Sequence, residues 1–397
     1  MKYLILQPDG VADLPIAELG DRTPLEYGRT PNMDRLASCG ILGMTHTIPK
    51  GLPPGSDVGT MSILGYDPRR YHTGRSPIEA ASMGVELGPD DVAFRCNLVC
   101  IEDGVMQDFT AGHISTEEAG EIVRDLQRQL GTDGIEFHPG VSYRHLLVWK
   151  DGKVSMRTTP PHDITDRSVA EHLPDGDGAD VLRRLMAASQ EILAQHAINR
   201  ARRQRGQRLA TSIWLWGQGK RPALPTLRQR FGIEGAVISA VDLVNGLGIL
   251  AGLEVIKVPG VTGFLDTNYQ GKASYGLRAL QRKDLVFIHV EATDETGHMG
   301  AVDKKIQAVE DFDSKIVGPI LEGLREVGDW RLLMTPDHAT PCALKTHTSD
   351  PVPFVVVEAR DLETGRSART YGERAAAATG LVVEEAHTLL PDYLVKG

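Results

Sequence analysis

Cysteine is scarce in this sequence: the 397 residues include only Cys39, Cys96, Cys100 and Cys342, and they form no Cys-x-x-Cys pair. This spacing excludes a zinc ribbon and predicts reduced, mostly buried thiols, which favours a cytoplasmic location. Long apolar runs are missing too. The first one, in MKYLILQPDG, is interrupted after a few residues by Pro-Asp-Gly, so we expect neither a signal peptide nor a membrane-spanning segment.

Positive charge is also in deficit. The chain has 43 Lys and Arg residues against 53 Asp and Glu, and the formal net charge of −10 argues against nucleic acid or an anionic membrane as a partner. The basic run RARRQRGQR, at 200–208, has no aromatic residues between its arginines, so we interpret it as a solvated helix face. A small anionic substrate is still compatible, because a few arginines or metal ions can reverse the field inside a cleft.

Three short apolar runs share one design, because each ends in acidic or histidine residues: YLILQPDG, LVFIHVEATDETGH and WRLLMTPDH. A fourth run, PVPFVVVEA, also reads as a strand, and helix-like segments such as 304–326 lie between the runs. This alternation predicts an α/β fold with a mostly parallel sheet and helices on both faces. In such sheets ligands bind beyond the carboxyl ends of the strands, where these acids and histidines would lie.

The length of the chain predicts two domains. The pattern of strands followed by acids stops after Ser56 and resumes only near the last third of the chain. We therefore expect a core formed by residues 1–75 and 237–397, and a smaller α/β domain, 76–236, inserted into it.

One serine stands out in the stretch GLPPGSDVG. Ser56 follows two prolines and a glycine and precedes a helix-like run, so it is expected at a helix N-terminus. Two interpretations are open from the residue types alone. Ser56 is either an ordinary N-cap or a reactive hydroxyl held where a helix stabilises negative charge.

Several oxygen and nitrogen side chains are candidates for metal ligands. Asp294 and His298 are spaced i, i+4, which places them on one helical face, and Asp337 and His338 are adjacent after a strand. Taken singly, such residues are usually turn or structural residues. Together with Asp9, Ser56 and His347, however, they are enough for two metal ions, an arrangement that suits phosphoryl chemistry. Ligands without thiolate suit manganese, magnesium, cobalt or zinc.

The motifs PDGVAD, PPGSDVGTMSILGYDP, FTAGHIS, HVEATDETGH and TPDHATPCALKTHTSDPVPF resemble those of the archaeal-type cofactor-independent phosphoglycerate mutases of the alkaline phosphatase superfamily. The resemblance implies a three-layer alkaline-phosphatase-like core with a mostly parallel sheet. It also implies that Ser56 is the nucleophile and becomes a phosphoserine. The implied ligands of one divalent ion are Asp9, Ser56, Asp337 and His338, and those of the other are Asp294, His298 and His347.

Further roles follow from the same resemblance. Lys272 is similar to a core lysine near the metals, and His113 is similar to the substrate-contacting histidine of the inserted domain. Candidate substrate groups in that domain are Arg144, Asp163, Lys220 and Arg221. We expect the inserted domain to close over the cleft, and His113 or Asp163 to act as general base.

The function that these expectations favour is interconversion of 3-phosphoglycerate and 2-phosphoglycerate, with two divalent ions, manganese first among them, and without 2,3-bisphosphoglycerate. One alternative is a homoserine kinase-like phosphotransferase, since members of this family with the same early motifs resemble one and the metal motifs do not separate the two. Another is a metal-dependent phosphatase or phosphodiesterase on the same core. The oligomeric state is left open.

Overall fold

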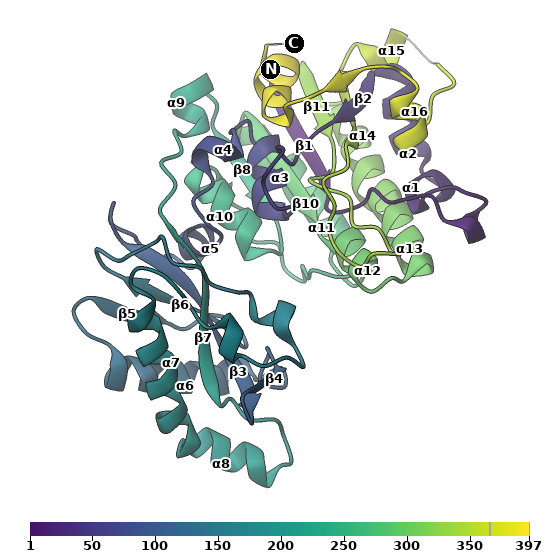
Figure 1. Cartoon of the computed structure of the whole chain (residues 1–397). Coiled ribbons are helices and arrows are strands. Elements are labelled where there is room, and N and C mark those ends of the chain that lie inside the picture. Colours follow the sequence, from purple (N-terminus) through teal and green to yellow (C-terminus); the bar gives the residue numbers. More distant parts are fainter. Residues whose placement is uncertain (365–366, 397) are drawn as a thin grey trace. The chain divides into compact units, whose positions relative to one another are not determined.

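The computed structural model describes residues 1–364 and 367–396, and the chain divides into two compact units (Figure 1). The core unit contains Met1–His72 and Leu224–Gly397, and the inserted unit is Thr73–Ala223. The expected boundaries at 76 and 236 both lie later in the chain than these. The second boundary differs most, because helix α9 (Leu227–Phe231) and strand β8 (Gly235–Ile238) belong to the core unit, where β8 pairs with β10 (Leu285–Val290).

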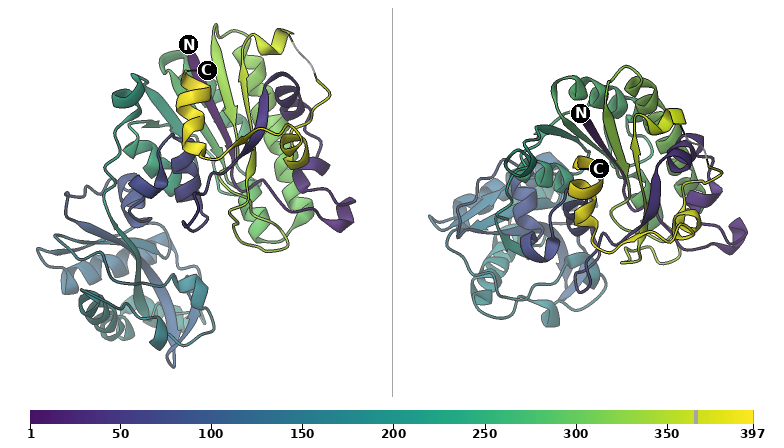
Figure 2. Two further views of the ribbon diagram at one scale, coloured as in Figure 1. Left: turned by 45° about the horizontal axis from the view of Figure 1, so that its top comes forward. Right: turned by 90° about the horizontal axis from the view of Figure 1, so that it is seen from above.

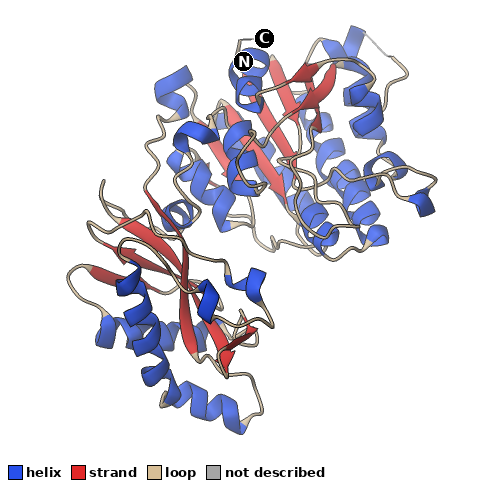
Figure 3. Cartoon of the chain, viewed as in Figure 1, coloured by secondary structure: helices blue, strands red, loops and turns tan. Residues whose placement is uncertain are grey.

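The described part of the core unit contains one eight-stranded sheet, in the order β13-β2-β12-β11-β1-β10-β8-β9 (Figure 3). Its other strands are β1 (Lys2–Pro8), β2 (Ile41–Thr45), β9 (Glu254–Val255), β11 (Trp330–Met334), β12 (Val352–Glu358) and β13 (Val382–Val383). Strand β12 runs antiparallel to both of its neighbours, and the other pairings are parallel. The predicted α/β class with a mostly parallel sheet is confirmed.

Helices cover both faces of this sheet (Figure 2). The reason is visible in β8, where successive side chains point to opposite sides. Gly248 of α10 (Asp242–Leu250) lies against Val237, whereas Gly276 of α11 (Tyr269–Arg282) lies against Ile238. The remaining described α-helices of the core unit are α1 (Pro24–Tyr27), α2 (Pro31–Cys39), α3 (Ser56–Ile63), α4 (Pro68–Tyr71), α12 (Ala292–His298), α13 (Val302–Phe312), α14 (Gly318–Leu324), α15 (Asp361–Thr364) and α16 (Glu373–Ala377). Short 3-10 or π helices span Ala17–Leu19, Asp313–Val317, Ala386–Thr388 and Leu389–Val395.

The inserted unit, all of which the structure describes, has its own five-stranded antiparallel sheet around β3 (Val92–Glu102). The other strands are β4 (Val105–Asp108), β5 (Ile135–His138), β6 (Arg144–Trp149) and β7 (Ser212–Lys220), and the helices are α5 (Ser76–Ser82), α6 (Thr116–Leu130), α7 (Ala179–Ala194) and α8 (Ala197–Gln204). Leu147 of β6 joins one apolar cluster with α6 and α7, and Leu146 and Val148 join another with α5. Each unit therefore has a hydrophobic core of its own.

Three strands of the core sheet bring polar residues to one edge. Strand β1 pairs in parallel with both β10 and β11, with Pro8 opposite Val290 and Leu6 opposite Met334. Because parallel strands end at the same edge, the residues that follow them lie close together. Among the described residues, we find no helix with the length and apolar character that crossing a bilayer requires.

Candidate metal centre

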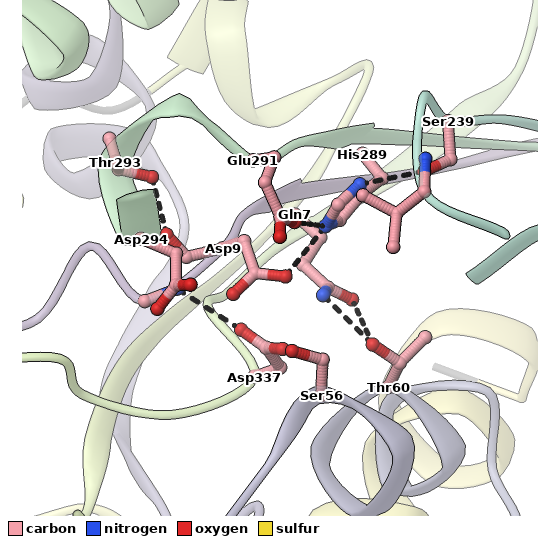
Figure 4. A network of polar contacts seen from close by, with 12 residues as sticks. Gln7, Asp9, Ser56, Thr60, Ser239, His289, Glu291, Thr293, Asp294 and Asp337 are labelled. Atoms are coloured by element: carbon pink, nitrogen blue, oxygen red, sulfur yellow. Dashed lines mark hydrogen bonds and ion pairs between the residues drawn. The ribbon is translucent and has the colours of Figure 1, made fainter. Parts of the chain in front are cut away.

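All seven residues predicted as metal ligands lie at this carboxyl edge of the core sheet, in two groups (Figure 4 shows part of the site). Asp9 follows β1, and Asp337 and His338 follow β11. Asp294 and His298 lie on α12, directly after β10, and His347 lies in the loop before β12. The first group is Asp294, His298 and His347; the second is Asp9, Asp337 and His338, with Ser56 beside it.

Ser56 is the first residue of α3, not its N-cap. The N-cap position is Gly55, which has no side chain, and the backbone N–H of Val58 donates to Oδ1 of Asp57. The Ser56 hydroxyl instead lies 3.2 Å from Nε2 of His338. The structure therefore excludes the N-cap interpretation, because the Ser56 hydroxyl lies beside a histidine across the site instead of capping the helix.

In the first group, hydrogen bonds assign the ring protons of both histidines. Nδ1 of His298 donates to the carbonyl oxygen of Lys345 at 3.0 Å, and Nδ1 of His347 donates to that of Pro54 at 3.4 Å. A carbonyl can only accept, so in the neutral rings each Nε2 carries a lone pair. These two Nε2 atoms lie 2.9 Å apart and within 3.5 Å of the Asp294 carboxylate. Two imidazole lone pairs and a carboxylate that face one another in this way can bind a cation.

The same logic holds for His338 in the second group. The Thr340 hydroxyl donates its hydrogen to the Asp294 carboxylate, so its oxygen accepts from Nδ1 of His338, 3.2 Å away. Nε2 of His338 is thus an acceptor as well, and it accepts the Ser56 hydroxyl hydrogen. It lies 3.6 Å from Oδ1 of Asp9 and 3.4 Å from Oδ2 of Asp337.

The two carboxylates of the second group each have one oxygen without a hydrogen-bond partner. Oδ1 of Asp9 and Oδ2 of Asp337 are buried and receive no donor, although both residues are fully enclosed. Buried charged oxygens of this kind are costly unless a cation satisfies them. The donor set of carboxylate, imidazole and hydroxyl therefore fits a divalent ion.

The pKa values of the site have the physical causes expected of enclosed, like-charged groups. Burial, reinforced by Asp337 and Glu291, raises the pKa of Asp9 well above its ordinary value. Burial acts in the same direction on Asp294, but its hydrogen bonds with His298 and His347 outweigh it and hold its pKa well below the ordinary value. Asp294 in turn raises the pKa of His298 to about 9. A bound cation would act on Asp9 as the histidines act on Asp294, by favouring the ionised carboxylate.

Two residues beside Asp9, the buried His289 and the half-buried Glu291, were missed from the sequence. Nε2 of His289, in β10, lies 2.7 Å from Oδ2 of Asp9 and 3.3 Å from Oε2 of Glu291. Burial, with Asp294, raises the pKa of Glu291 to about 8. The signal that could have revealed them is the interruption of the apolar run LVFI by His and Glu, since polar residues in a buried strand need partners.

Lys272, predicted as a core lysine near the metals, lies at the same edge. Its side chain is fully buried on α11, and its ammonium group donates to the backbone carbonyl of His289 at 2.8 Å. Burial lowers its pKa to about 8.

The other predicted substrate residues belong to the inserted unit. The ring of His113 and the guanidinium of Arg144 both approach the ring of Tyr143, with centroid distances of 6.5 Å and 5.6 Å. The exposed Asp163 lies 3.5 Å from His162. Lys220 forms an exposed ion pair with Asp90, and Arg221 is exposed.

The basic run at 200–208 is not wholly a solvated face, which corrects that interpretation. Arg202 is only 3% exposed and donates to the carbonyl of Ala111, to that of Arg208 and to Glu118. Its contact with Ala111 fastens a turn in which Ala111, Gly112 and His113 all have positive φ angles of 49°, 67° and 48°. Arg202 thus donates a hydrogen bond to a carbonyl oxygen in this turn, whose positive φ angles are rare for residues other than glycine.

Fold and site together define an α/β protein with a metal-competent centre at the carboxyl edge of a mostly parallel sheet. A sequence model of the 2,3-bisphosphoglycerate-independent phosphoglycerate mutases matches residues 37–199. A probable mutase of this name from Geobacter sulfurreducens is 52% identical over 394 residues, and one from Methanosarcina barkeri is 50% identical over 392; each comparison covers 98% of both chains. The chain belongs to the 2,3-bisphosphoglycerate-independent phosphoglycerate mutase family.

Solved structures agree with this membership. A protein from Pyrococcus horikoshii has a TM-score of 0.81 and 32% identity, covering 98% of this chain and 95% of that one. A cofactor-independent phosphoglycerate mutase from Thermoplasma acidophilum has a TM-score of 0.64 and 26% identity, covering 98% and 99%. The similarity therefore extends over both units of the chain.

Proposed function

We propose that this protein interconverts 3-phosphoglycerate and 2-phosphoglycerate through a phosphorylated Ser56, without 2,3-bisphosphoglycerate. One observation carries the proposal: the Ser56 hydroxyl donates to the bare Nε2 of His338, beside two buried carboxylate oxygens that lack donors. The mutase names of the full-length relatives support the choice of substrate.

The donor atoms fit two divalent ions. Asp9, Ser56, Asp337 and His338 would hold one, and Asp294, His298 and His347 would hold the other. Manganese is our first choice, and magnesium, cobalt and zinc suit the same oxygen and imidazole ligands. When bound, such ions neutralise the phosphoryl oxygens and lower the pKa of a serine hydroxyl.

The reaction then needs two transfers at Ser56. In the first, Oγ attacks the phosphorus of the substrate, the bond from phosphorus to the glycerate oxygen breaks, and the proton lost by Ser56 passes to that oxygen. In the second, the other hydroxyl of the glycerate attacks the phosphoserine, and Ser56 recovers a proton. The N-terminal position of Ser56 on α3 stabilises the negative charge that develops on Oγ.

We assign the remaining predicted residues to the substrate. The guanidinium and ammonium groups of Arg144, Lys220, Arg221 and Lys272 suit phosphate and carboxylate oxygens. His113 or Asp163 would take and return the hydroxyl protons of the glycerate. We place the reaction in the cytoplasm, which the free thiols of Cys39, Cys96, Cys100 and Cys342 support.

The first test gives manganese-loaded protein 3-phosphoglycerate, without bisphosphoglycerate or nucleotide, and follows 2-phosphoglycerate by phosphorus NMR. We expect conversion to equilibrium. Absence of product would overturn the substrate assignment. Phosphorylation of homoserine by a nucleotide, or rapid hydrolysis of an aryl phosphate, would then identify a kinase-like transferase or a phosphatase on the same core.

The role of Ser56 has its own test. Ser56→Ala should lower turnover on the order of 10³-fold or more, because the proposed mechanism carries the phosphoryl group on this hydroxyl. The exposed Ser314→Ala is the matched control and should keep full turnover. Mass spectrometry of the peptide containing Ser56, after quenching during turnover, should show the added phosphoryl group. Retained turnover in Ser56→Ala would remove the phosphoserine mechanism.

A further inference from the structure

His289 differs from the three histidines of the two ligand groups in the partner of its Nδ1 atom. That atom lies 2.9 Å from the Ser239 hydroxyl oxygen, and this oxygen already accepts the backbone N–H of Val241 at 2.9 Å. Both His289 and Ser239 are buried, with 0% and 7% exposure. The hydroxyl hydrogen of Ser239 therefore has a ring nitrogen as its natural acceptor.

This arrangement places the ring proton of His289 on the opposite nitrogen. Because Nδ1 accepts from Ser239, Nε2 carries the hydrogen and donates it to Oδ2 of Asp9, at 2.7 Å (Figure 4). In the neutral rings of His298, His338 and His347, by contrast, Nδ1 donates and Nε2 carries the lone pair. At this site, three histidines can therefore bind a cation through Nε2, whereas His289 uses its Nε2 to donate a hydrogen bond.

The donated hydrogen bond determines which oxygen of Asp9 is free. Oδ2 is occupied by His289, and Oδ1, which has no donor, lies 3.6 Å from Nε2 of His338. Asp337 is held in the same manner from the other side, since the backbone N–H of Gly10 donates to its Oδ1 and leaves Oδ2 free. Each carboxylate is therefore fixed through one oxygen and presents the other.

A different assignment would make His289 a ligand. Asp9, His289 and Glu291 lie close enough together to surround a cation of their own. That assignment leaves the Ser239 hydroxyl without an acceptor among the contacts of the described residues, and it places a bare Nε2 2.7 Å from a carboxylate oxygen. The donor assignment satisfies Ser239, His289 and Oδ2 of Asp9 together, so the hydrogen bonds favour it.

We propose that His289, with its ring proton set by Ser239, is a positioning residue that fixes Asp9 so that only Oδ1 binds the ion shared with Asp337 and His338. The inference rests on the two-ion site of the proposed function. It adds a residue that touches neither ion and yet controls the affinity of one of them. Partners of this kind typically change metal affinity about 10–100-fold.

The test measures manganese binding by the loss of the free-ion signal in electron paramagnetic resonance. His347→Ala is used as the background, because it leaves the Asp9 group as the intact site. In this background, His289→Leu should weaken binding about 10–100-fold. His289→Gln, which keeps an N–H donor, should recover most of the affinity, and Ser239→Ala should weaken binding by an intermediate factor. His172→Leu, in the inserted unit, is the matched control and should change nothing.

The second ion supplies an internal comparison. In an Asp9→Ala background, His289→Leu should leave manganese binding by the Asp294 group within about twofold, because a positioning residue acts only through its own partner. A general loss of packing would weaken both groups, and that result would overturn the proposal. Near-ultraviolet circular dichroism of the chelated variants shows whether each is folded.

Two further outcomes would overturn the proposal. One is a folded His289→Leu variant whose Asp9 group binds manganese with unchanged affinity. If that variant does not fold, unchanged manganese affinity in Ser239→Ala would overturn the proposal instead. The other is three ions in the wild-type protein and two in His289→Leu, which would make His289 a ligand. If the wild type binds two ions but these variants show no effect, only the inference fails. If it binds none, the proposed function fails with it.

Discussion

At the scale of single residues, the site depends on which ring nitrogen of each histidine carries the proton. Nδ1 of His298 and Nδ1 of His347 donate hydrogen bonds to the backbone carbonyls of Lys345 and Pro54. Nδ1 of His338 donates to the hydroxyl oxygen of Thr340. None of these three partners is itself among the proposed ligands. The ligand atoms are thus prepared by neighbours that a list of ligands alone would omit.

His145, a buried histidine of the inserted unit, gives a prediction about pH. His145 is 2% exposed; its Nδ1 accepts the backbone N–H of Gly140 at 3.0 Å, and its Nε2 has no partner. Burial lowers its pKa to about 3, from an ordinary value of 6.5. The folded state therefore binds fewer protons than the unfolded state between these values, so stability present above pH 6.5 is lost as the pH falls.

We expect His145→Asn, whose side-chain oxygen can accept from Gly140, to remove this dependence. Between about pH 7.5 and about pH 5, the wild type should lose about 2 kcal/mol more unfolding free energy than the variant. Urea unfolding followed by tryptophan fluorescence is suitable, because three of the four tryptophans, Trp149, Trp214 and Trp216, lie in the inserted unit. His172→Asn is the control, and equal pH dependence in wild type and His145→Asn would contradict the prediction.

At the scale of elements, helix α3 reaches the site only because of a glycine. A Cβ atom on Gly59 would collide with the carbonyl oxygen of Asp337, so this face of α3 lies directly against the loop after β11. On the same helix, Thr60 exchanges hydrogen bonds with the buried Gln7 of β1. The position of Ser56 is thus set by the contact of α3 with two strands that carry ligands.

Gly59→Ala should therefore move α3 away from Asp337 and misplace Ser56. We expect a loss of about 1–3 kcal/mol in unfolding free energy, as overpacking usually causes, together with lower turnover. Chemical denaturation and the phosphorus NMR assay measure the two effects. Gly328→Ala, where a Cβ would meet nothing within 4 Å, is the control for both. Wild-type turnover in Gly59→Ala would show that the close contact is not needed.

The elements also show why the sequence predicted one boundary poorly. Strand β8 has only four residues, Gly235–Ile238, and nothing in them distinguishes a strand of the core sheet from one of the inserted unit. Its membership is decided by pairing with β10, about fifty positions later in the chain. Arg202 is a similar case, because its charge suggests an exposed face and only the turn at Ala111 explains its burial.

At the scale of the whole molecule, each unit has its own hydrophobic core. We therefore expect the unfolding free energy of one unit to change without an equal change in the other. All seven proposed ligands lie in the core unit. Ions that bind only the folded state stabilise it by mass action. Their removal should therefore act on the core unit and leave the inserted unit largely unchanged.

Scanning calorimetry with manganese and with a chelator tests this expectation. We predict that chelation lowers the melting temperature of the core unit by several degrees and abolishes turnover. A variant with both Asp9→Ala and His347→Ala is the control, and its melting should not respond to manganese. A wild-type melting curve that is indifferent to chelation would count against seven real ligands.

The sequence by itself determined the α/β class, the four core strands β1, β10, β11 and β12, and the seven candidate ligands. It could do so because apolar strands that end in acids and histidines are local patterns, and parallel strands bring their ends to one edge. Only the tertiary structure decided that Ser56 is not an N-cap, which oxygen of Asp9 is free, and that His289 donates to it. Each of these depends on hydrogen bonds between segments far apart in the chain, such as the one between Ser239 and His289. No local pattern specifies such partners, because folding alone brings them within reach.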